Sequence, residues 1–214
     1  MQFVFDRKET GKAFSYLLSL PENFDKEKER LPMIVFLHGA GERGDWPQML
    51  TANGIPKITQ ETSPVRAIIF SPQCLPGRIW NTQVYPLKEL IDEIAAEYNA
   101  DPDRISVTGL SMGGFGTWEM GLSFPDAFSA LAPICGGGTS WRCDLLKMPI
   151  RAFHGTDDQT VPVRNSIEMV DAVKANGGNA DLVLYHMVGH DCWTRTYEQT
   201  DIIEWLIQQK RKQK

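Results

Sequence analysis

The stretch "RISVTGLSMGGFGTW", from Arg104 to Trp118, decides the fold of this 214-residue chain. Its first part, "ISVTG" at 105–109, is apolar and rich in β-branched residues, which is typical of a buried strand. Its last part continues into "FGTWEMGLSF" at 115–124, which is typical of a helix. Only a short glycine-rich segment separates the two, so the chain has to turn sharply around Ser111.

The turn contains the pattern G-x-S-x-G, in which Gly109 and Gly113 flank Ser111. A strand, a tight turn and a helix with this pattern hold the serine in a strained conformation, with its hydroxyl clear of the sheet. Because the helix begins directly after the serine, backbone N–H groups face the substrate oxygen on which negative charge develops. The pattern alone also fits an ordinary tight turn. Its place between a predicted strand and a predicted helix favours Ser111 as a nucleophile.

Outside this stretch, apolar runs alternate with helix-like segments. Several of the runs are apolar on both faces, as strands covered by helices on both sides must be. Strands are predicted at 14–20, 33–38, 66–71, 105–109, 128–134, 150–154 and 181–186. Helices are predicted at 86–99, 115–124, 163–178 and 197–210. The alternation predicts a mostly parallel, doubly wound sheet of about seven strands, with functional groups in the loops at the carboxyl ends of the strands.

Length and composition fit one α/β domain over residues 1–214. A formal net charge of −5 gives no reason to expect nucleic acid or an anionic membrane as a partner. No window approaches about 18 consecutive apolar residues, and the N-terminus has no signal-peptide pattern. We therefore expect a cytoplasmic protein from the sequence as it stands, with export of a longer precursor as the alternative.

The wide spacing of the cysteines favours free thiols in or near the core over a metal site, a redox motif or a disulfide. The four cysteines are Cys74, Cys135, Cys143 and Cys192.

A serine hydroxyl is a poor nucleophile without a base, and the base needs a carboxylate that orients it. The loop after the strand at 181–186 supplies His190, which we predict to be the base. His186 is expected within that strand. His38 and His154 each precede a glycine at a strand end, where a structural role is expected.

The acid is expected in the loop after the strand at 150–154, where Asp157 and Asp158 are adjacent. Only one of these carboxylates can point at His190. The order Ser…Asp…His is the one found with this serine turn. The residues by themselves leave the choice between the two aspartates open.

An oxyanion hole needs two hydrogen-bond donors. One is the backbone N–H of Met112, the residue after the predicted nucleophile. The second is expected in the loop "HGAGERG" at 38–44, where glycines let the backbone approach a substrate closely. We favour Ala40, with Gly41 as the alternative. Two charged residues of this loop are expected to fix it by pairing: Glu42 and Arg43.

Together these motifs resemble the α/β-hydrolase superfamily. More narrowly, they resemble small bacterial esterases near the phospholipase/carboxylesterase and polyhydroxybutyrate-depolymerase-like groups, some of which are labelled predicted peptidases. The matching stretches run in the family's order from about residue 33 to 193: "FLHGAGERG", "SPQC", "DPDRISVTGLSMGGFGTW", "FHGTDDQTVP" and "GHDCW". The resemblance implies an α/β-hydrolase fold that hydrolyses carboxylic esters without a metal or an organic cofactor.

The family pattern H-G-x-x-D-x-x-V-P fits residues 154–162 and selects Asp158 as the acid, which leaves Asp157 as a turn or capping residue. The triad that the resemblance implies is Ser111, Asp158 and His190. The resemblance also suggests Trp80 and Trp193 near the substrate pocket, with core packing as the alternative for each. The predicted pocket residues are Gly41, Trp80 and Trp193.

The sequence therefore predicts a serine carboxylesterase that acts on small-molecule esters with short acyl chains or with small aromatic or sugar groups. No insertion between strands is long enough for a substantial helical lid, so lipase behaviour at an oil surface is not expected. A serine peptidase on the same triad is the main alternative, although the β-propeller with which oligopeptidase relatives screen substrates is absent. A non-catalytic binding relative is disfavoured, because such a protein would usually have lost a triad residue.

Overall fold

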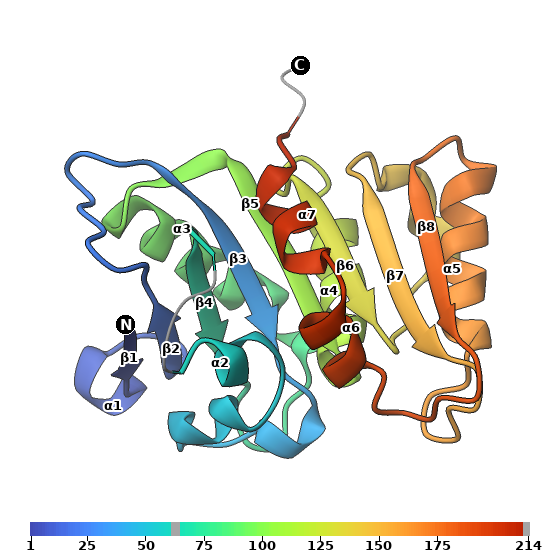
Figure 1. The fold of residues 1–214 in the computed structure, drawn as a ribbon, viewed down its shortest axis with the longest axis horizontal. Coiled ribbons are helices and arrows are strands. Elements are labelled where there is room, and N and C mark those ends of the chain that lie inside the picture. The colour runs from blue at the N-terminus through green and yellow to red at the C-terminus, as the bar shows by residue number, and fades with distance from the viewer. Residues whose placement is uncertain (61–64, 212–214) are drawn as a thin grey trace.

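The structure, a computed structural model, describes residues 1–60 and 65–211. Its strands are β1 (Gln2–Phe5), β2 (Tyr16–Ser19), β3 (Leu31–Leu37), β4 (Ile68–Pro72), β5 (Ala100–Leu110), β6 (Ala130–Ile134), β7 (Ile150–Gly155) and β8 (Ala180–Tyr185). They form one sheet in the order β1-β2-β4-β3-β5-β6-β7-β8 (Figure 1). β2 pairs antiparallel with both of its neighbours, β1 and β4, and all other neighbouring strands in this order pair in parallel. The mostly parallel, doubly wound sheet predicted from the sequence is confirmed.

The strand predictions differ from the structure at β1, β5 and the end of β8. β1 was not predicted because it is a four-residue edge strand with exposed middle residues and no clear alternation. β5 begins at Ala100 rather than at 105, since charged residues and Pro102 hide its first part in the sequence. β8 ends at Tyr185, so His186 lies in the turn after the strand and not within it.

The longer helices are α3 (Val84–Glu97), α4 (Met112–Ser123) and α5 (Arg164–Ala175), and the shorter ones are α1 (Arg7–Thr10), α2 (Gly54–Ile58), α6 (Trp193–Gln199) and α7 (Ile202–Gln208). Short 3₁₀ turns are η1 (Ala40–Glu42), η2 (Pro47–Ala52), η3 (Trp80–Thr82) and η4 (Ser140–Leu145). The prediction of one helix over 197–210 was wrong. Thr200 is extended between α6 and α7, and its hydroxyl bonds the carbonyl of Thr196 and the N–H of Ile202, which interrupts the helical ladder.

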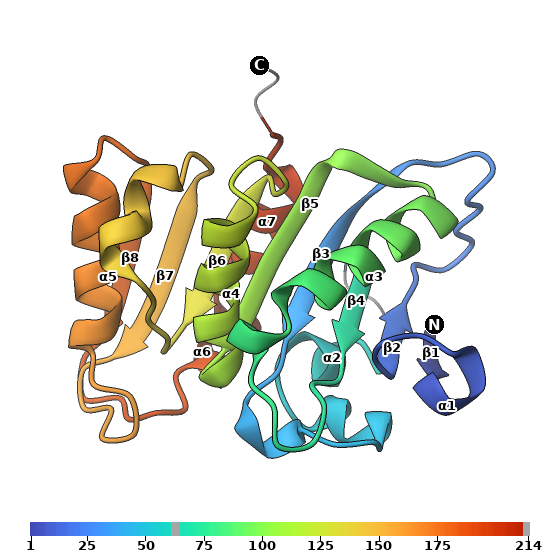
Figure 2. The same cartoon turned by 180° about the vertical axis from the view of Figure 1, so that it is seen from behind.

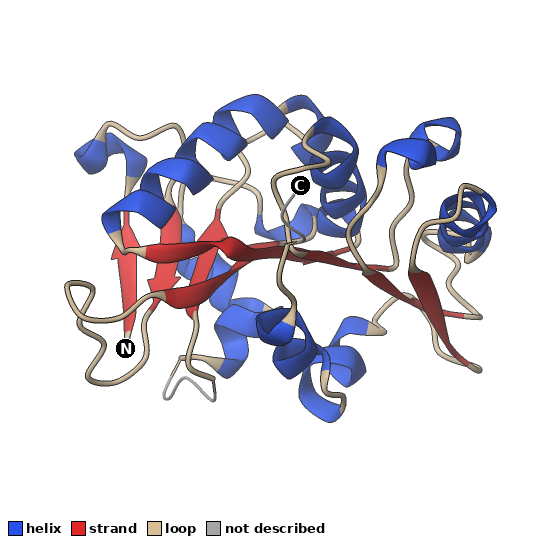
Figure 3. Ribbon diagram, turned by 90° about the horizontal axis from the view of Figure 1, so that it is seen from above, coloured by secondary structure: helices blue, strands red, loops and turns tan. Residues whose placement is uncertain are grey.

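Helices cover both faces of the sheet (Figures 1, 2 and 3). Figure 2 shows α3, α4 and α5 on one face, and Figure 1 shows α2, α6 and α7 on the other. Successive residues of a strand point to opposite faces, so each strand supplies both cores. Val35 of β3 packs in the core under α3, α4 and α5, whereas Ile34 and Phe36 pack in the core under α2, α6 and α7.

The chain reverses its winding direction at β3. β4 lies on one side of β3 and β5 on the other, so the connections that leave β3 and β5 diverge at the carboxyl edge of the sheet. Such an edge is where open α/β sheets place their sites. Between β6 and β7 the described chain forms only the short turn η4, so no helical lid is inserted there. None of the helices in the described ranges is both long and apolar enough to cross a membrane.

The turn at Ser111 depends on close packing of α4 against the ends of β3 and β5. A Cβ on Gly113 would lie 1.9 Å from the carbonyl oxygen of Leu37, and one on Gly109 would lie 2.5 Å from the carbonyl oxygen of Gly113. Ser111 itself has φ 54° and ψ −117°, which a residue with a side chain rarely adopts. The two glycines therefore permit the approach, and the packing holds the serine in its strained conformation.

Replacing Gly113 with alanine tests this close approach. The methyl group has no space against a strand carbonyl, so we expect Gly113→Ala to lower the free energy of unfolding by at least about 2 kcal/mol. Gly41→Ala is the matched control, because a Cβ there would meet nothing within 4 Å. Urea denaturation of the three proteins measures the difference, and an unchanged unfolding free energy for Gly113→Ala would contradict the packing argument.

Candidate active site

The three residues of the predicted triad lie together at the carboxyl edge of the sheet. Ser111 follows β5, Asp158 follows β7 and His190 follows β8. His190 Nε2 is 2.8 Å from Ser111 Oγ, and His190 Nδ1 is 2.7 Å from Asp158 Oδ2. The structure thus brings together a hydroxyl, an imidazole and a carboxyl group from three strand ends. Asp157 N–H donates to the carbonyl of Val188, which ties the acid loop to the loop that carries the histidine.

The two adjacent aspartates have different surroundings. The Asp158 side chain is fully buried, and its Oδ1 accepts the backbone N–H groups of Thr160 and Val161 at 2.9 Å each. Asp157 is exposed, and its Oδ1 accepts the hydroxyl of Thr156. The geometry therefore favours Asp158, and not Asp157, as the group that orients the histidine.

The charge of Asp158 follows from its hydrogen bonds. Burial by itself raises the pKa of this carboxyl, but the hydrogen bonds from His190 and from the N–H groups of Val161 and Thr160 outweigh burial and hold the pKa below its ordinary value. Asp158 is therefore ionised at neutral pH and accepts the Nδ1 hydrogen of His190. This assigns the tautomer in which Nε2 of His190 is free to take a proton from Ser111.

His154 contacts the loop after β7 that carries Asp158. Its Nε2 lies 2.9 Å from the carbonyl of Val161 and 3.2 Å from Asp158 Oδ2, and its Nδ1 lies 2.7 Å from Ser166 Oγ. Burial lowers the pKa of His154, so the ring is neutral and carries no competing charge beside Asp158. His154 thus fixes the loop after β7, as a structural histidine would.

The two predicted oxyanion donors each begin a helical turn. Met112 is the first residue of α4, and Ala40 is the first residue of η1. The N–H groups of a first turn have no partner within their own helix, so both are available to a ligand. Gly39 packs against Leu110, because a Cβ on it would lie 2.9 Å from Leu110 Cδ1. The η1 turn therefore lies directly beside the serine turn, with Ala40 and Gly41 exposed.

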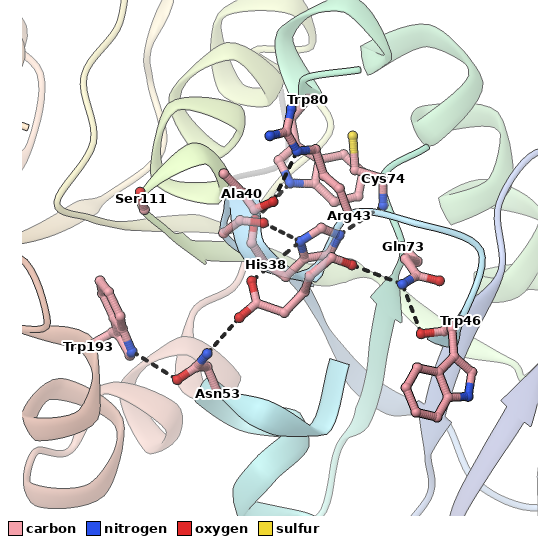
Figure 4. A network of polar contacts seen from close by, with 12 residues as sticks. His38, Ala40, Arg43, Trp46, Asn53, Gln73, Cys74, Trp80, Ser111 and Trp193 are labelled. Carbon is pink, nitrogen blue, oxygen red and sulfur yellow. Dashed lines mark hydrogen bonds and ion pairs between the residues drawn. The ribbon is translucent and has the colours of Figure 1, made fainter. Parts of the chain in front are cut away.

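His38 sets the orientation of the peptide before Ala40 (Figure 4). The Nδ1 of His38 lies 2.6 Å from the carbonyl oxygen of Gly39, and its Nε2 accepts the N–H of Cys74 at 2.9 Å. Nδ1 therefore carries the hydrogen, and burial lowers the pKa of this histidine to about 4, which keeps it neutral. In a trans peptide the C=O and the next N–H point in opposite directions. A carbonyl held by His38 thus turns the Ala40 N–H away from His38.

The two tryptophans predicted near the pocket occupy different positions. Trp80 is fully buried, donates its Nε1–H to the carbonyl of His38 at 3.0 Å, and packs edge-on against the His38 ring. It does not reach the surface, so the pocket prediction is corrected to the core-packing alternative. Trp193 is partly exposed, and its ring meets the His190 ring nearly at right angles, with centroids 5.2 Å apart. Its Nε1–H donates to Asn53 Oδ1 at 3.4 Å (Figure 4).

Glu42 and Arg43 each hold the η1 loop through hydrogen bonds of their own. Within the described residues, no ion pair joins the two side chains. Arg43 Nε–H donates to the carbonyl of Ala40, and its Nη1–H donates to the carbonyl of Arg78. Glu42 is buried, and its Oε1 accepts the amide N–H of Asn53 at 2.6 Å. Asn53 was missed in the sequence, because nothing in its local pattern indicates a contact with two separate loops.

The thiol of Cys135 lies close to two residues of the predicted triad. Among the described residues, one group could offer three metal ligands: the sulfur of Cys135, an oxygen of Asp158 and a ring nitrogen of His190 lie within 4.8 Å of one another. Burial, and then the hydrogen bond with Cys192, raise the pKa of the Cys135 thiol far above its ordinary value. Metal binding requires the thiolate, and Asp158 and His190 already bond each other. The cluster therefore fits proton transfer better than metal binding.

Comparison with known proteins agrees with this geometry. Residues 77–214 match the family model named Esterase, described as "Putative esterase". The crystal structure of a thermostable esterase superposes with a TM-score of 0.83 and 34% sequence identity, over 99% of this chain and 63% of that one. This likeness identifies the sheet as that of the α/β-hydrolase fold. Peptidases are also among the structural neighbours, at 16% identity, a level that shows only the fold.

Two curated proteins are similar in sequence. Poly(3-hydroxyalkanoate) depolymerase C of Paucimonas lemoignei is 42% identical over 64 residues, which are 29% of this chain and 16% of that protein. "Probable feruloyl esterase C" of Aspergillus terreus is 27% identical over 170 residues, which are 76% of this chain and 62% of that protein. The chain thus spans less than two thirds of either relative.

Exchanging each aspartate for asparagine separates the two carboxyl groups by role. Removing the charge of the acid while keeping its shape lowers kcat by about 10⁴ in a serine protease. We expect Asp158→Asn to lower kcat on a short ester at least about 10²-fold, scaled down from that case. Asp157→Asn should change kcat less than about 10-fold, because asparagine keeps the hydrogen bonds of a loop aspartate. A large loss in Asp157→Asn instead would reverse the assignment.

The neutral state of His38 gives stability a dependence on pH. Its pKa is about 4 in the fold and 6.5 in the unfolded chain, so the unfolded chain takes up a proton as pH falls below 6.5. The free energy of unfolding therefore falls between pH 7 and pH 5, with about 2 kcal/mol of the fall due to His38. In His38→Asn the side-chain amide can still donate to the carbonyl of Gly39. The fall in unfolding free energy between pH 7 and pH 5 should therefore be smaller by about 2 kcal/mol in this variant. Denaturation at both pH values measures it, and equal falls would show that His38 does not contribute.

Proposed function

The chain belongs to the Esterase family, and we propose that it is a serine carboxylesterase that forms an acyl-enzyme on Ser111. The observation that carries the proposal is the continuous hydrogen-bond chain from Asp158 through His190 to Ser111, with the serine in a strained turn at the start of α4. A family that acts on ester bonds supplies the reaction class. The proposed substrates are small-molecule esters with short acyl chains or with small aromatic or sugar groups.

In the first half-reaction, Ser111 Oγ attacks the carbonyl carbon of the ester while its proton passes to His190 Nε2. Asp158 stabilises the imidazolium that forms, because its carboxylate already accepts the Nδ1 hydrogen. The negative charge on the substrate oxygen meets the N–H groups of Met112 and Ala40. His190 then gives its proton to the departing alcohol, and the acyl group stays on Ser111.

In the second half-reaction, a water molecule takes the place of the alcohol. His190 Nε2 accepts a proton from this water as its oxygen attacks the acyl carbon. The same two N–H groups stabilise the second oxyanion. When the intermediate collapses, the proton returns from His190 to Ser111 Oγ and the carboxylic acid leaves.

The open site favours short acyl chains. Ala40 and Gly41 are exposed at its edge, and the described chain between β6 and β7 adds only η4. Each buried methylene contributes about 0.8 kcal/mol to binding, and only where a groove receives it. Long chains therefore gain little at this site.

The experiment measures hydrolysis of 4-nitrophenyl acetate, butyrate and palmitate by the wild-type chain and by Ser111→Ala. We expect activity to be lost in Ser111→Ala and retained in Ser123→Ala, a control at the far end of α4. A fluorophosphonate should add its mass to Ser111, and labelling at another serine would overturn the assignment.

In the same series, the acetyl and butyryl esters should exceed the palmitoyl ester in kcat/KM. Faster turnover of the long chain at an oil surface would contradict the open site. A chromogenic peptide cleaved faster than every ester would favour the peptidase alternative. Labelling of Ser111 without turnover of any of these compounds would point to a non-catalytic binding protein.

A further inference from the structure

Glu42 places a buried carboxyl group in the same turn as the proposed oxyanion donor. It is the last residue of η1 and is only 6% exposed, although acidic side chains are seldom buried without a partner. Its carboxyl lies against Gly39, since a Cβ on Gly39 would be 3.3 Å from Glu42 Oε2 and 2.9 Å from Leu110 Cδ1. Glu42 Oε2 and the residue before Ser111 therefore face the same glycine.

One oxygen of this carboxyl is fixed by a chain of hydrogen bonds. Glu42 Oε1 accepts the Asn53 amide N–H at 2.6 Å, and Asn53 Oδ1 accepts the Trp193 Nε1–H at 3.4 Å. Trp193 in turn packs edge-on against the ring of His190. This chain of hydrogen bonds and ring contacts runs from the η1 turn to the loop that carries His190, and Figure 4 shows its link between Asn53 and Trp193. It holds the Glu42 side chain in one orientation.

The other oxygen of Glu42 has no hydrogen-bond donor among the described residues. The nearest cationic candidate is His38 Nδ1 at 3.8 Å, but its hydrogen is donated to the carbonyl of Gly39. The neutral state of His38 also rules out an ion pair at neutral pH. A buried polar atom without a partner destabilises the fold unless water or a ligand reaches it. The carboxyl side chain keeps 8% of its surface exposed, and Oε2 is not among the fully buried atoms without a partner, so water or a ligand can reach it.

We propose that Glu42 is a specificity-determining residue whose Oε2 accepts a hydrogen bond from a hydroxyl group of the substrate, close to the ester bond that is cleaved. This inference rests on the proposed esterase function and names a feature of its substrates. A hydroxyl group is the favoured donor, because Arg43, whose Nε–H bonds the carbonyl of Ala40, carries a positive charge at the same turn and repels an ammonium group. The hydroxyl can belong to the acyl part or to the alcohol part of the ester.

The test compares esters with and without a hydroxyl group, in two arms. The acyl arm uses 4-nitrophenyl butyrate and 4-nitrophenyl 3-hydroxybutyrate. The alcohol arm uses propyl acetate and 2,3-dihydroxypropyl acetate, followed by alkali uptake at constant pH. Each kcat/KM is divided by the rate constant for hydroxide-catalysed hydrolysis, which removes differences in intrinsic reactivity. In one arm the wild-type chain should prefer the hydroxylated ester at least about 10-fold, as for a hydrogen bond to a charged group.

Glu42→Gln changes this preference without removing the anchor. The glutamine oxygen can still accept the Asn53 N–H, and its amide nitrogen then takes the place of Oε2, as a donor instead of an acceptor. The preference should fall to about 2-fold or less. It is a ratio of two rates of the same variant, so a general change in activity does not affect it. Glu204→Gln, at an exposed position of α7, is the control for loss of charge and should keep the wild-type preference.

Two results would overturn the inference: a wild-type chain that shows no preference in either arm, or a Glu42→Gln variant that keeps the preference. If Glu42→Gln fails to fold, the comparison of the two esters with the wild-type chain still tests the inference. Asn53→Ala supplies a second variant. Asn53→Ala keeps the carboxyl but removes its anchor, so it should weaken the preference. Failure of the esterase proposal is distinguishable, because no ester in either arm would then be cleaved, with or without a hydroxyl group.

Discussion

The approach of α4 to the end of β3 is the contact on which the site depends. Gly113 lies so close to the carbonyl oxygen of Leu37 that a methyl group has no space. This approach sets the first N–H of α4 beside the η1 turn, and it holds Ser111 at φ 54° and ψ −117°. Burial in the two cores stabilises the sheet and its helices, and the packed sheet in turn maintains a serine conformation that an isolated turn would lose.

Burial disfavours the charged form of each titratable group around this turn, and the hydrogen bonds decide which group stays charged. Asp158 keeps its charge because hydrogen bonds from His190 and two backbone N–H groups outweigh its desolvation. Burial lowers the pKa of both His38 and His154. A protonated His38 would present a hydrogen at each ring nitrogen, and the Cys74 N–H would then lose its acceptor. Fixed negative charge at Asp158 therefore coexists with neutral rings at His38 and His154, which shape the loops.

The order of strands and helices and the serine turn could be predicted from the sequence because each depends on local patterns, whereas the choice of Asp158 over Asp157 came only from the resemblance to a known family. Apolar runs reveal buried strands, and a motif of fixed spacing places each polar residue just after one. The edge strand β1 and the break between α6 and α7 at Thr200 were not predicted, because short exposed strands and side-chain hydrogen bonds leave no periodic signal in the sequence. Asn53 also escaped, since its contact with Trp193 spans 140 residues of sequence and exists only in the folded chain.

The η1 turn combines two chemistries that would otherwise oppose each other. A carboxyl group near an oxyanion raises the energy of that negative charge, whereas a backbone N–H such as the one proposed at Ala40 lowers it. The guanidinium of Arg43, bonded to the carbonyl of Ala40, adds a positive charge at the same turn and offsets the field of Glu42. The directions of the two groups also differ, because His38 orients the Ala40 peptide and Asn53 orients the carboxyl. In the roles proposed for Ala40 and Glu42, separate anchors for donor and acceptor would allow one three-residue turn to stabilise the reacting oxygen and to select the group beside it.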